Sequence, residues 1–334
     1  MNKTLPAILA VLVPLTAGAI GEQDFERDWN SKVGPWMAEH SVPGKLPGAQ
    51  GVTLRYLAVE APEPRAALVV LGGHSESFYK YAELMYDLRD LGISIYALDP
   101  RGQGASDRLL PDRQKSHVDR WRNYVDDLSR FITTVVRPRT TAPVIALGHS
   151  LGGGIVAAYL EQDPSALDSA ILSAPLVGHK VSGAVKALLG VLDVFGGTGY
   201  VPGGGPFTPV AFEANKETHS RVRHARKFQD YADHPEIRLG FPTVHWMVET
   251  SRMAQSVVAG ASRITVPTLV FQAEQDEYVE ARALESFTAG VNGCRRVMVP
   301  GARHEMLIET DAVRDTVLAE IHAFILGRIA AAGS

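Results

Sequence analysis

The sequence predicts an α/β fold with a mostly parallel, doubly wound sheet that carries helices on both faces. Three apolar runs, at 66–71, 93–98 and 144–147, are each followed by a segment with helical periodicity. Strands buried on both faces appear as continuous apolar runs, and strands that alternate with helices form parallel sheets. Each run ends in a glycine-rich or polar break, at the edge where ligands of such sheets bind. We therefore expect a functional site along this edge.

Other segments of the chain fit the same pattern. Apolar runs predict further strands at 52–59, 169–173, 268–272 and 296–299. Helical periodicity predicts helices at 79–91, 123–135, 155–162, 282–289 and 311–329. Residues 24–50 are polar and contain two tryptophans, and they predict a helix and a loop packed on the outside.

The segment 176–262 lacks any buried-strand pattern, so it predicts a helical cap inserted into the sheet domain. The sheet domain itself should then consist of 20–175 and 263–334. Within the cap, 181–195 predicts an apolar helix, and 215–231 predicts a basic segment. A further cap helix is expected at 243–258.

Composition limits the classes of partner. The chain has 334 residues, of which 46% are hydrophobic and 21% charged, as expected for a globular protein with a large core. Its formal net charge of −4 gives no overall attraction to nucleic acid, so no nucleic-acid partner is expected. The single cysteine, Cys294, excludes an internal disulfide and a thiolate metal site.

The N-terminal residues 1–19 resemble a secretory signal peptide. Lys3 is followed by a mainly apolar run that ends in Ala17-Gly18-Ala19, a small-residue pattern typical of a cleavage site. The run is shorter than the roughly 20 residues that span a bilayer. We expect a periplasmic or secreted protein, with an uncleaved membrane-surface anchor as the alternative.

The strand at 144–147 leads into Gly148-His-Ser150-Leu-Gly152 and then directly into a helix. In this context Gly-x-Ser-x-Gly predicts a nucleophile elbow, whose strained turn lifts the serine hydroxyl above the sheet edge. Side chains two residues before and after the serine must then be nearly absent. The helix N-terminus favours negative charge that develops beside the serine. The alternative is a glycine-rich turn with an idle serine.

An acid and a base stand at the ends of two later strands. Asp276 follows the strand at 268–272, and His304 follows the strand at 296–299. The chain order Ser150, Asp276, His304 is that of the α/β-hydrolase arrangement, in which the three loops meet at one sheet edge. Glu274 and Glu277 are alternatives to Asp276 as the acid.

These residue types suit acyl transfer. A serine hydroxyl needs a neighbouring base, so His304 is predicted to take its proton and pass it to the leaving group. Asp276 would fix the imidazole tautomer and stabilise the imidazolium. The backbone N–H groups of Leu151 and His74 are the predicted oxyanion donors.

The motifs Gly148-His-Ser-Leu-Gly152, Asp99-Pro-Arg-Gly-Gln-Gly-Ala-Ser106 and Gly301-Ala-Arg-His304 resemble the α/β-hydrolase group of monoacylglycerol lipases and bacterial lysophospholipases of the PldB type. The segments 76–88, 117–120, 218–221 and 242–246 are more similar to the lysophospholipases. The resemblance covers roughly 24–330. It implies hydrolysis of the acyl ester of a lysophospholipid with no cofactor and no metal. The chain departs from the lipase pattern at Gly72-Gly73, where the lipases have His-Gly before the oxyanion residue.

Several hypotheses about substrate and partners remain. The apolar helix either packs on the body or uses Leu188 and Leu192 to receive an acyl chain or to touch a membrane surface. The basic segment is either a solvated face or, through Arg221, an anion-binding site for a substrate phosphate. If Arg221 binds a substrate phosphate, a lysophospholipid substrate is favoured over a monoacylglycerol, and a monoacylglycerol lipase or a general carboxylesterase is the alternative. An aminopeptidase is disfavoured because it needs acidic cap residues, and a non-catalytic lipid-binding protein is the alternative from another class.

Overall fold

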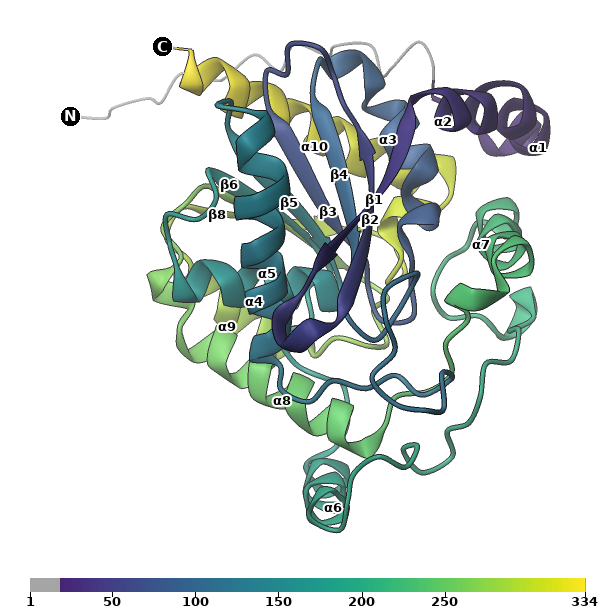
Figure 1. Ribbon diagram of the computed structural model, residues 1–334, viewed down its shortest axis with the longest axis vertical. Coiled ribbons are helices and arrows are strands. Elements are labelled where there is room, and N and C mark those ends of the chain that lie inside the picture. The colour runs from purple at the N-terminus through teal and green to yellow at the C-terminus, as the bar shows by residue number, and fades with distance from the viewer. Residues whose placement is uncertain (1–18, 334) are drawn as a thin grey trace.

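The computed structural model describes residues 19–333, and its centre is one sheet of eight strands in the order β1-β2-β4-β3-β5-β6-β7-β8 (Figure 1). The strands are β1 (Ser41–Pro47), β2 (Thr53–Val59), β3 (Ala67–Leu71), β4 (Ser94–Asp99), β5 (Val144–His149), β6 (Ser169–Ser173), β7 (Thr268–Ala273) and β8 (Cys294–Val299). β1, β2 and β4 pair antiparallel, and all other neighbours pair parallel. The predicted α/β fold with a mostly parallel sheet is confirmed.

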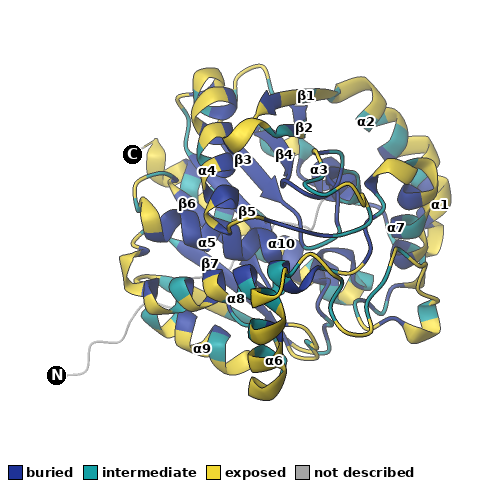
Figure 2. Ribbon diagram, turned by 60° about the horizontal axis from the view of Figure 1, so that its bottom comes forward, coloured by how far each residue is buried: buried dark blue, intermediate teal, exposed yellow. Residues whose placement is uncertain are grey.

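Helices cover both faces of this sheet. They are α1 (Phe25–Asp28), α2 (Gly34–His40), α3 (Ala82–Asp87), α4 (Arg122–Phe131), α5 (Leu151–Gln162), α6 (Gly183–Val194), α7 (Arg221–Asp233), α8 (Val244–Ala259), α9 (Ala281–Gly290) and α10 (Asp311–Ala332). Alternate residues of β3 point to opposite faces: Val69 packs in the core shared with α4, α5, α8 and α9, and Leu68 packs in the core shared with α3 and α10. Figure 2 shows the resulting buried strands between two helical layers.

The prediction for residues 24–50 was wrong at its end, because β1 is an edge strand of the sheet and not a loop. Its sequence contains Pro43, Gly44 and Pro47, which are depleted in strands. Proline is tolerated on an edge, where one side of the backbone needs no partner. Gly44 is required there because a Cβ would lie 2.1 Å from the Tyr56 ring on β2.

Between β6 and β7 the described chain forms α6, α7 and α8 and contributes no strand to the sheet. α8 is anchored in the main core through Trp246, Met253 and Val257. In α6 only Leu189 is buried, and the helix lies at the margin of the molecule beside α8 (Figures 1 and 2).

No helix among residues 19–333 has the length and apolar character to cross a membrane. The predicted signal peptide, apart from Ala19, lies outside the described residues. Export therefore stays a prediction.

Candidate active site

Ser150 stands in a strained turn between β5 and α5. Its φ of 48° and ψ of −114° lie where side chains are disfavoured. The turn is possible because its neighbours are glycines: a Cβ on Gly148 would lie 2.6 Å from the Gly152 backbone, and one on Gly152 would lie 2.2 Å from the Leu71 carbonyl oxygen. The local geometry is therefore that of the predicted elbow, with Ser150 at the carboxyl end of a central strand.

Two backbone N–H groups are free beside Ser150. Leu151 begins α5, and His74 lies in the loop after β3; neither N–H has an acceptor within residues 19–333. The loop turns at Ser75, whose φ is 63°. The His74 ring packs against Trp246 with 4.6 Å between the ring centroids, and burial lowers the pKa of the His74 imidazole to about 4. His74 lines the same cavity as Ser150, and Leu151 follows Ser150 directly at the start of α5, so their backbone N–H groups stay the predicted oxyanion donors.

Asp276 and His304 meet as the strand order predicts. His304 Nδ1 lies 2.8 Å from Asp276 Oδ2, while Asp276 Oδ1 accepts the backbone N–H groups of Tyr278 and Val279. Burial lowers the pKa of His304, but the hydrogen bond and charge of Asp276 outweigh it and raise the pKa above 6.5. Burial likewise raises the pKa of Asp276, and the His304 contact reverses this, so that the pKa is lowered. The pair holds Nε2 of His304 free to act as a base.

The two alternative acids are engaged elsewhere. Glu274 accepts the backbone N–H of Gly301 at 2.7 Å, and Glu277 forms an exposed ion pair with Lys216 at 2.7 Å. Of the three carboxylates, Asp276 is the one that contacts His304.

A cavity of about 280 Å³ joins these groups. Its lining includes His74, Ser150 and His304, with the side chains of Trp246 and Tyr278. No hydrogen bond links Ser150 to His304 within residues 19–333; such contacts are often long before substrate binds. Ser150, His304 and His74 thus line one space, as acyl transfer at this serine requires.

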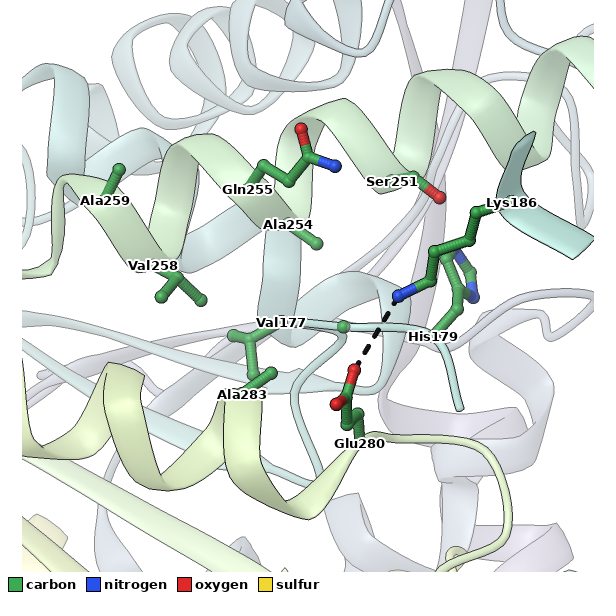
Figure 3. Close-up of a pocket in the computed structure, with 11 residues that line it drawn as sticks. Val177, His179, Lys186, Ser251, Ala254, Gln255, Val258, Ala259, Glu280 and Ala283 are labelled. Atoms are coloured by element: carbon green, nitrogen blue, oxygen red, sulfur yellow. Dashed lines mark ion pairs between the residues drawn. The ribbon is translucent and has the colours of Figure 1, made fainter. Parts of the chain in front are cut away.

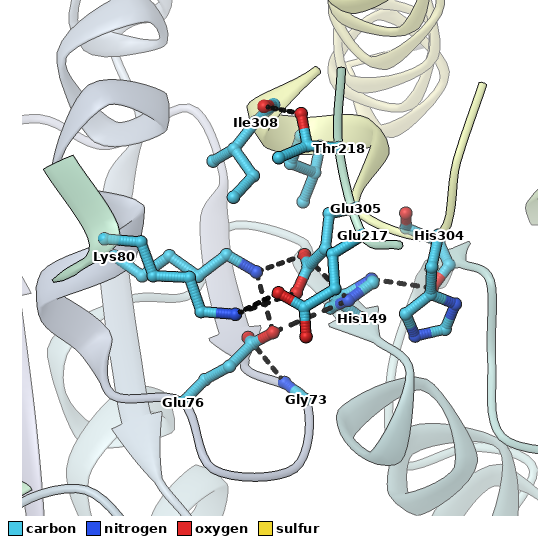
Figure 4. Close-up of polar contacts among 12 residues, drawn as sticks. Gly73, Glu76, Lys80, His149, Glu217, Thr218, His304, Glu305 and Ile308 are labelled. Carbon is cyan, nitrogen blue, oxygen red and sulfur yellow. Dashed lines mark hydrogen bonds and ion pairs between the residues drawn. The ribbon is translucent and has the colours of Figure 1, made fainter. Parts of the chain in front are cut away.

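A buried charge cluster forms part of the wall of this cavity, and Figure 4 shows its polar contacts. Its members, which come from four separate regions of the chain, are Glu76, Lys80, His149, Glu217, Lys227 and Glu305. Lys80 lies between two carboxylates: its Nζ is 2.7 Å from Glu76 Oε1 and also bonds Glu305. His149 Nε2 is 3.0 Å from Glu305 Oε2, and the His149 ring packs on His304 with 4.9 Å between centroids.

The cluster touches each part of the site. Glu76 accepts the Gly73 N–H at 2.7 Å and so holds the loop that carries His74. Burial alone would raise the pKa of Glu305, but Lys80, His149 and Lys227 lower it well below its usual value. Glu76, His149 and Glu305 could in principle ligate a metal ion, yet the Lys80 ammonium already pairs with both carboxylates. We therefore assign no metal to the cluster. Sequence reasoning missed it, and the Glu76–Lys80 spacing of four residues is its one local signal.

The predicted substrate roles of the cap residues are not supported by their positions. Arg221 is exposed, pairs with Glu213 at 2.8 Å and does not line the cavity. The whole basic segment is neutralised by ion pairs within the chain: Lys216–Glu277, Arg221–Glu213, Arg223–Glu83, Arg226–Asp230 and Lys227–Glu217. Leu188 and Leu192 are exposed on α6 and do not line the cavity either.

The cavity also contains charges that the sequence did not indicate. Glu217, within the predicted cap, and Glu277, in the loop after β7, both line it, so the segment 176–262 contributes an acidic side chain as well as the basic run. Each of these carboxylates is paired with a lysine. Lys180 also lines the cavity. Its Nζ donates to the backbone oxygen of Asp276 at 2.7 Å, and its charge, after that of Lys216, helps to lower the pKa of Glu277 without a direct ion pair among residues 19–333.

The sheet order, the elbow and the Asp276–His304 pair together define an α/β-hydrolase. Residues 62–311 match the family model described as serine aminopeptidase, S33, and the chain belongs to this family.

Individual relatives are similar over most of their length. Lysophospholipase L2 of Escherichia coli K12 is 35% identical over 322 residues, which cover 90% of this chain and 94% of the relative. The monoacylglycerol lipase of Mycolicibacterium smegmatis is 26% identical, with 87% and 98% covered. A soluble variant of the Saccharomyces cerevisiae monoglyceride lipase has a similar structure, with a TM-score of 0.70, 18% identity and coverage of 85% and 94%.

Proposed function

We propose that the protein is a lysophospholipase that releases the fatty acid of a lysophospholipid through an acyl-enzyme. The similarity to lysophospholipase L2 across 90% of the chain is the observation that carries this proposal. The geometry supports it, since Ser150 and the Asp276–His304 pair face one cavity.

The reaction follows from the positions of the groups. His304 Nε2 accepts the proton of Ser150 as its oxygen attacks the acyl carbonyl, and Asp276 stabilises the imidazolium that forms. The N–H groups of Leu151 and His74 stabilise the oxyanion. His304 then protonates the leaving glycerol oxygen, and water attacks the acyl-enzyme by the same route in reverse.

We assign recognition of the substrate phosphate to Lys180 and not to Arg221, which the sequence suggested. The basic cap segment is internally paired, whereas Lys180 lines the cavity and forms no direct ion pair with a carboxylate of the described chain. An ammonium at that position suits a phosphate and has no equivalent task with a monoacylglycerol.

The apolar face of α6 supports a role at the lipid surface from which the substrate comes. Val185, Leu188, Val191 and Leu192 are all exposed on this helix. Scattered apolar residues need no explanation, but a contiguous patch indicates an interaction site. Binding to lysophospholipid-containing vesicles should weaken in Leu188→Ser; unchanged co-sedimentation would remove α6 from this role.

The test is labelling with a fluorophosphonate followed by a substrate panel. The probe should label the wild-type protein and leave Ser150→Ala unlabelled, with roughly a thousandfold or greater loss of rate and an unchanged fold. Lysophosphatidylcholine should be cleaved faster than a monoacylglycerol with the same acyl chain. A preference for the monoacylglycerol, or for an aminoacyl p-nitroanilide as the family description suggests, would contradict the proposal. Absence of labelling would favour a non-catalytic lipid-binding protein.

A further inference from the structure

A second cavity of about 320 Å³ opens between α8 and α9, outside the site described above (Figure 3). Most of its wall is apolar and made of small or branched side chains: Val177, Ala254, Val258, Ala259 and Ala283. We call it the α8–α9 slot. The ion pair of Lys186 with Glu280, at 3.7 Å, lies beside His179 on its rim.

The α8–α9 slot adjoins the cavity at Ser150. His179 lines both spaces, and the consecutive residues Leu176 and Val177 line one each. His179 Nε2 lies 2.9 Å from Thr250 Oγ1 on α8, which holds the ring where the two spaces meet. Burial lowers the pKa of His179 to about 4, so this ring is uncharged at neutral pH.

One face of α8 runs through both spaces. Met247 lines the cavity at Ser150, and Ser251, Ala254 and Val258 line the α8–α9 slot. These positions are separated by four, three and four residues, so they share one face of the helix. At 1.5 Å per residue the track from Met247 to Val258 is about 16 Å long. That length matches an acyl chain, which fills one leaflet of about 15 Å, half of the bilayer core.

The cavity at Ser150 is small, and part of its wall is charged. Its 280 Å³ lies just below the range of about 300–1,000 Å³ that is usual for small-molecule sites. Four glutamates also line it: Glu76, Glu217, Glu277 and Glu305. The α8–α9 slot extends the apolar part of this wall, which includes Leu176, Trp246 and Met247.

We propose that the α8–α9 slot binds the distal part of the substrate acyl chain, with the reacting ester at Ser150 and the chain passing His179. This inference rests on the proposed function only in that the substrate carries a long acyl chain. The small side chains Ala254 and Ala283 leave the space open, so they set the preference for chain length.

The test compares p-nitrophenyl butanoate with p-nitrophenyl dodecanoate. Ala283→Leu places a larger side chain in the slot, and Ala289→Leu adds the same side chain at an exposed position of the same helix. In Ala283→Leu, kcat/KM for the dodecanoate should fall about tenfold or more, while kcat/KM for the butanoate stays within about twofold. Ala289→Leu should leave both values unchanged. Equal effects on the two esters, or none on the dodecanoate, would overturn the proposal.

A second variant guards against misfolding. Ser251→Leu narrows the slot from α8 and should give the same selective loss, with the butanoate rate reporting an intact fold. Because these esters carry no headgroup, the result is independent of the lysophospholipid assignment. If the protein cleaves no lysophospholipid but its variants show the selective loss with the dodecanoate, the proposed function is refuted and the proposal that the α8–α9 slot binds the acyl chain stands.

Discussion

Replacing Asp276 by asparagine tests the pair at the centre of the site. The asparagine oxygen can still accept the N–H groups of Tyr278 and Val279, so the loop should keep its shape. Its NH₂ group then faces His304 Nδ1, 2.8 Å away in the native protein. The imidazole must place its proton on Nε2 to accept that hydrogen bond, and it can no longer take the proton of Ser150. We expect kcat to fall about 10⁴-fold.

The pH dependence of Asp276→Asn provides a second measurement. His304 acts as a base when neutral, so wild-type kcat/KM should fall as the pH drops through a pKa above 6.5. Burial lowers the pKa of His304, and Asp276 contributes most to raising it, with smaller contributions from Glu305 and Glu217. Without the carboxylate the acidic limb of the residual activity should therefore move to lower pH.

The matched control is Glu277→Gln, which changes a neighbouring carboxylate whose partner is Lys216. Its kcat/KM should stay within about threefold of the wild type, because exposed ion pairs contribute little. A loss below tenfold in Asp276→Asn, or a larger loss in Glu277→Gln, would refute this assignment of the acid.

Substitutions at three further positions test other parts of the structure. Gly148→Ala places a Cβ 2.6 Å from the backbone of Gly152, so the free energy of unfolding measured by denaturant titration should fall by about 3 kcal/mol. An unchanged denaturation midpoint would refute this close packing. Lys180→Met should lower kcat/KM for lysophosphatidylcholine about tenfold, which corresponds to about 1.4 kcal/mol, and should leave kcat/KM for a monoacylglycerol unchanged. Equal losses for the two substrates would show that Lys180 does not recognise the headgroup. Glu76→Ala leaves the buried ammonium of Lys80 with Glu305 as its remaining close partner and should lower the free energy of unfolding by about 3–5 kcal/mol. Glu76→Gln should lower it by less. If both variants were as stable as the wild type, the assignment of a buried charge cluster would be contradicted.

The parts of the site that follow from strand order could be predicted from the sequence. Ser150, Asp276 and His304 each come directly after an apolar run, and the carboxyl ends of parallel strands share one edge. The glycines beside Ser150 add a steric signal, because few other sequences permit that turn. Periodicity therefore sufficed for the sheet and for the positions of these side chains.

Features that depend on long-range pairing could not be predicted in this way. β1 contains two prolines, and only its place on the sheet edge makes it a strand. The partners of the basic cap segment include Glu83, which lies 140 residues away in the chain. Charge counted along the sequence could not show that the segment is neutralised. The α8–α9 slot likewise results from the packing of two helices whose sequences carry no mark of it.

The buried charge cluster also constrains how this enzyme can diverge. Glu76, Lys80, Glu305 and Lys227 balance one another away from water, so replacing any one of them leaves an uncompensated ion. Tolerated changes must therefore come in pairs or larger groups. Over evolutionary time these positions should covary, while exposed charges such as Arg221 drift independently.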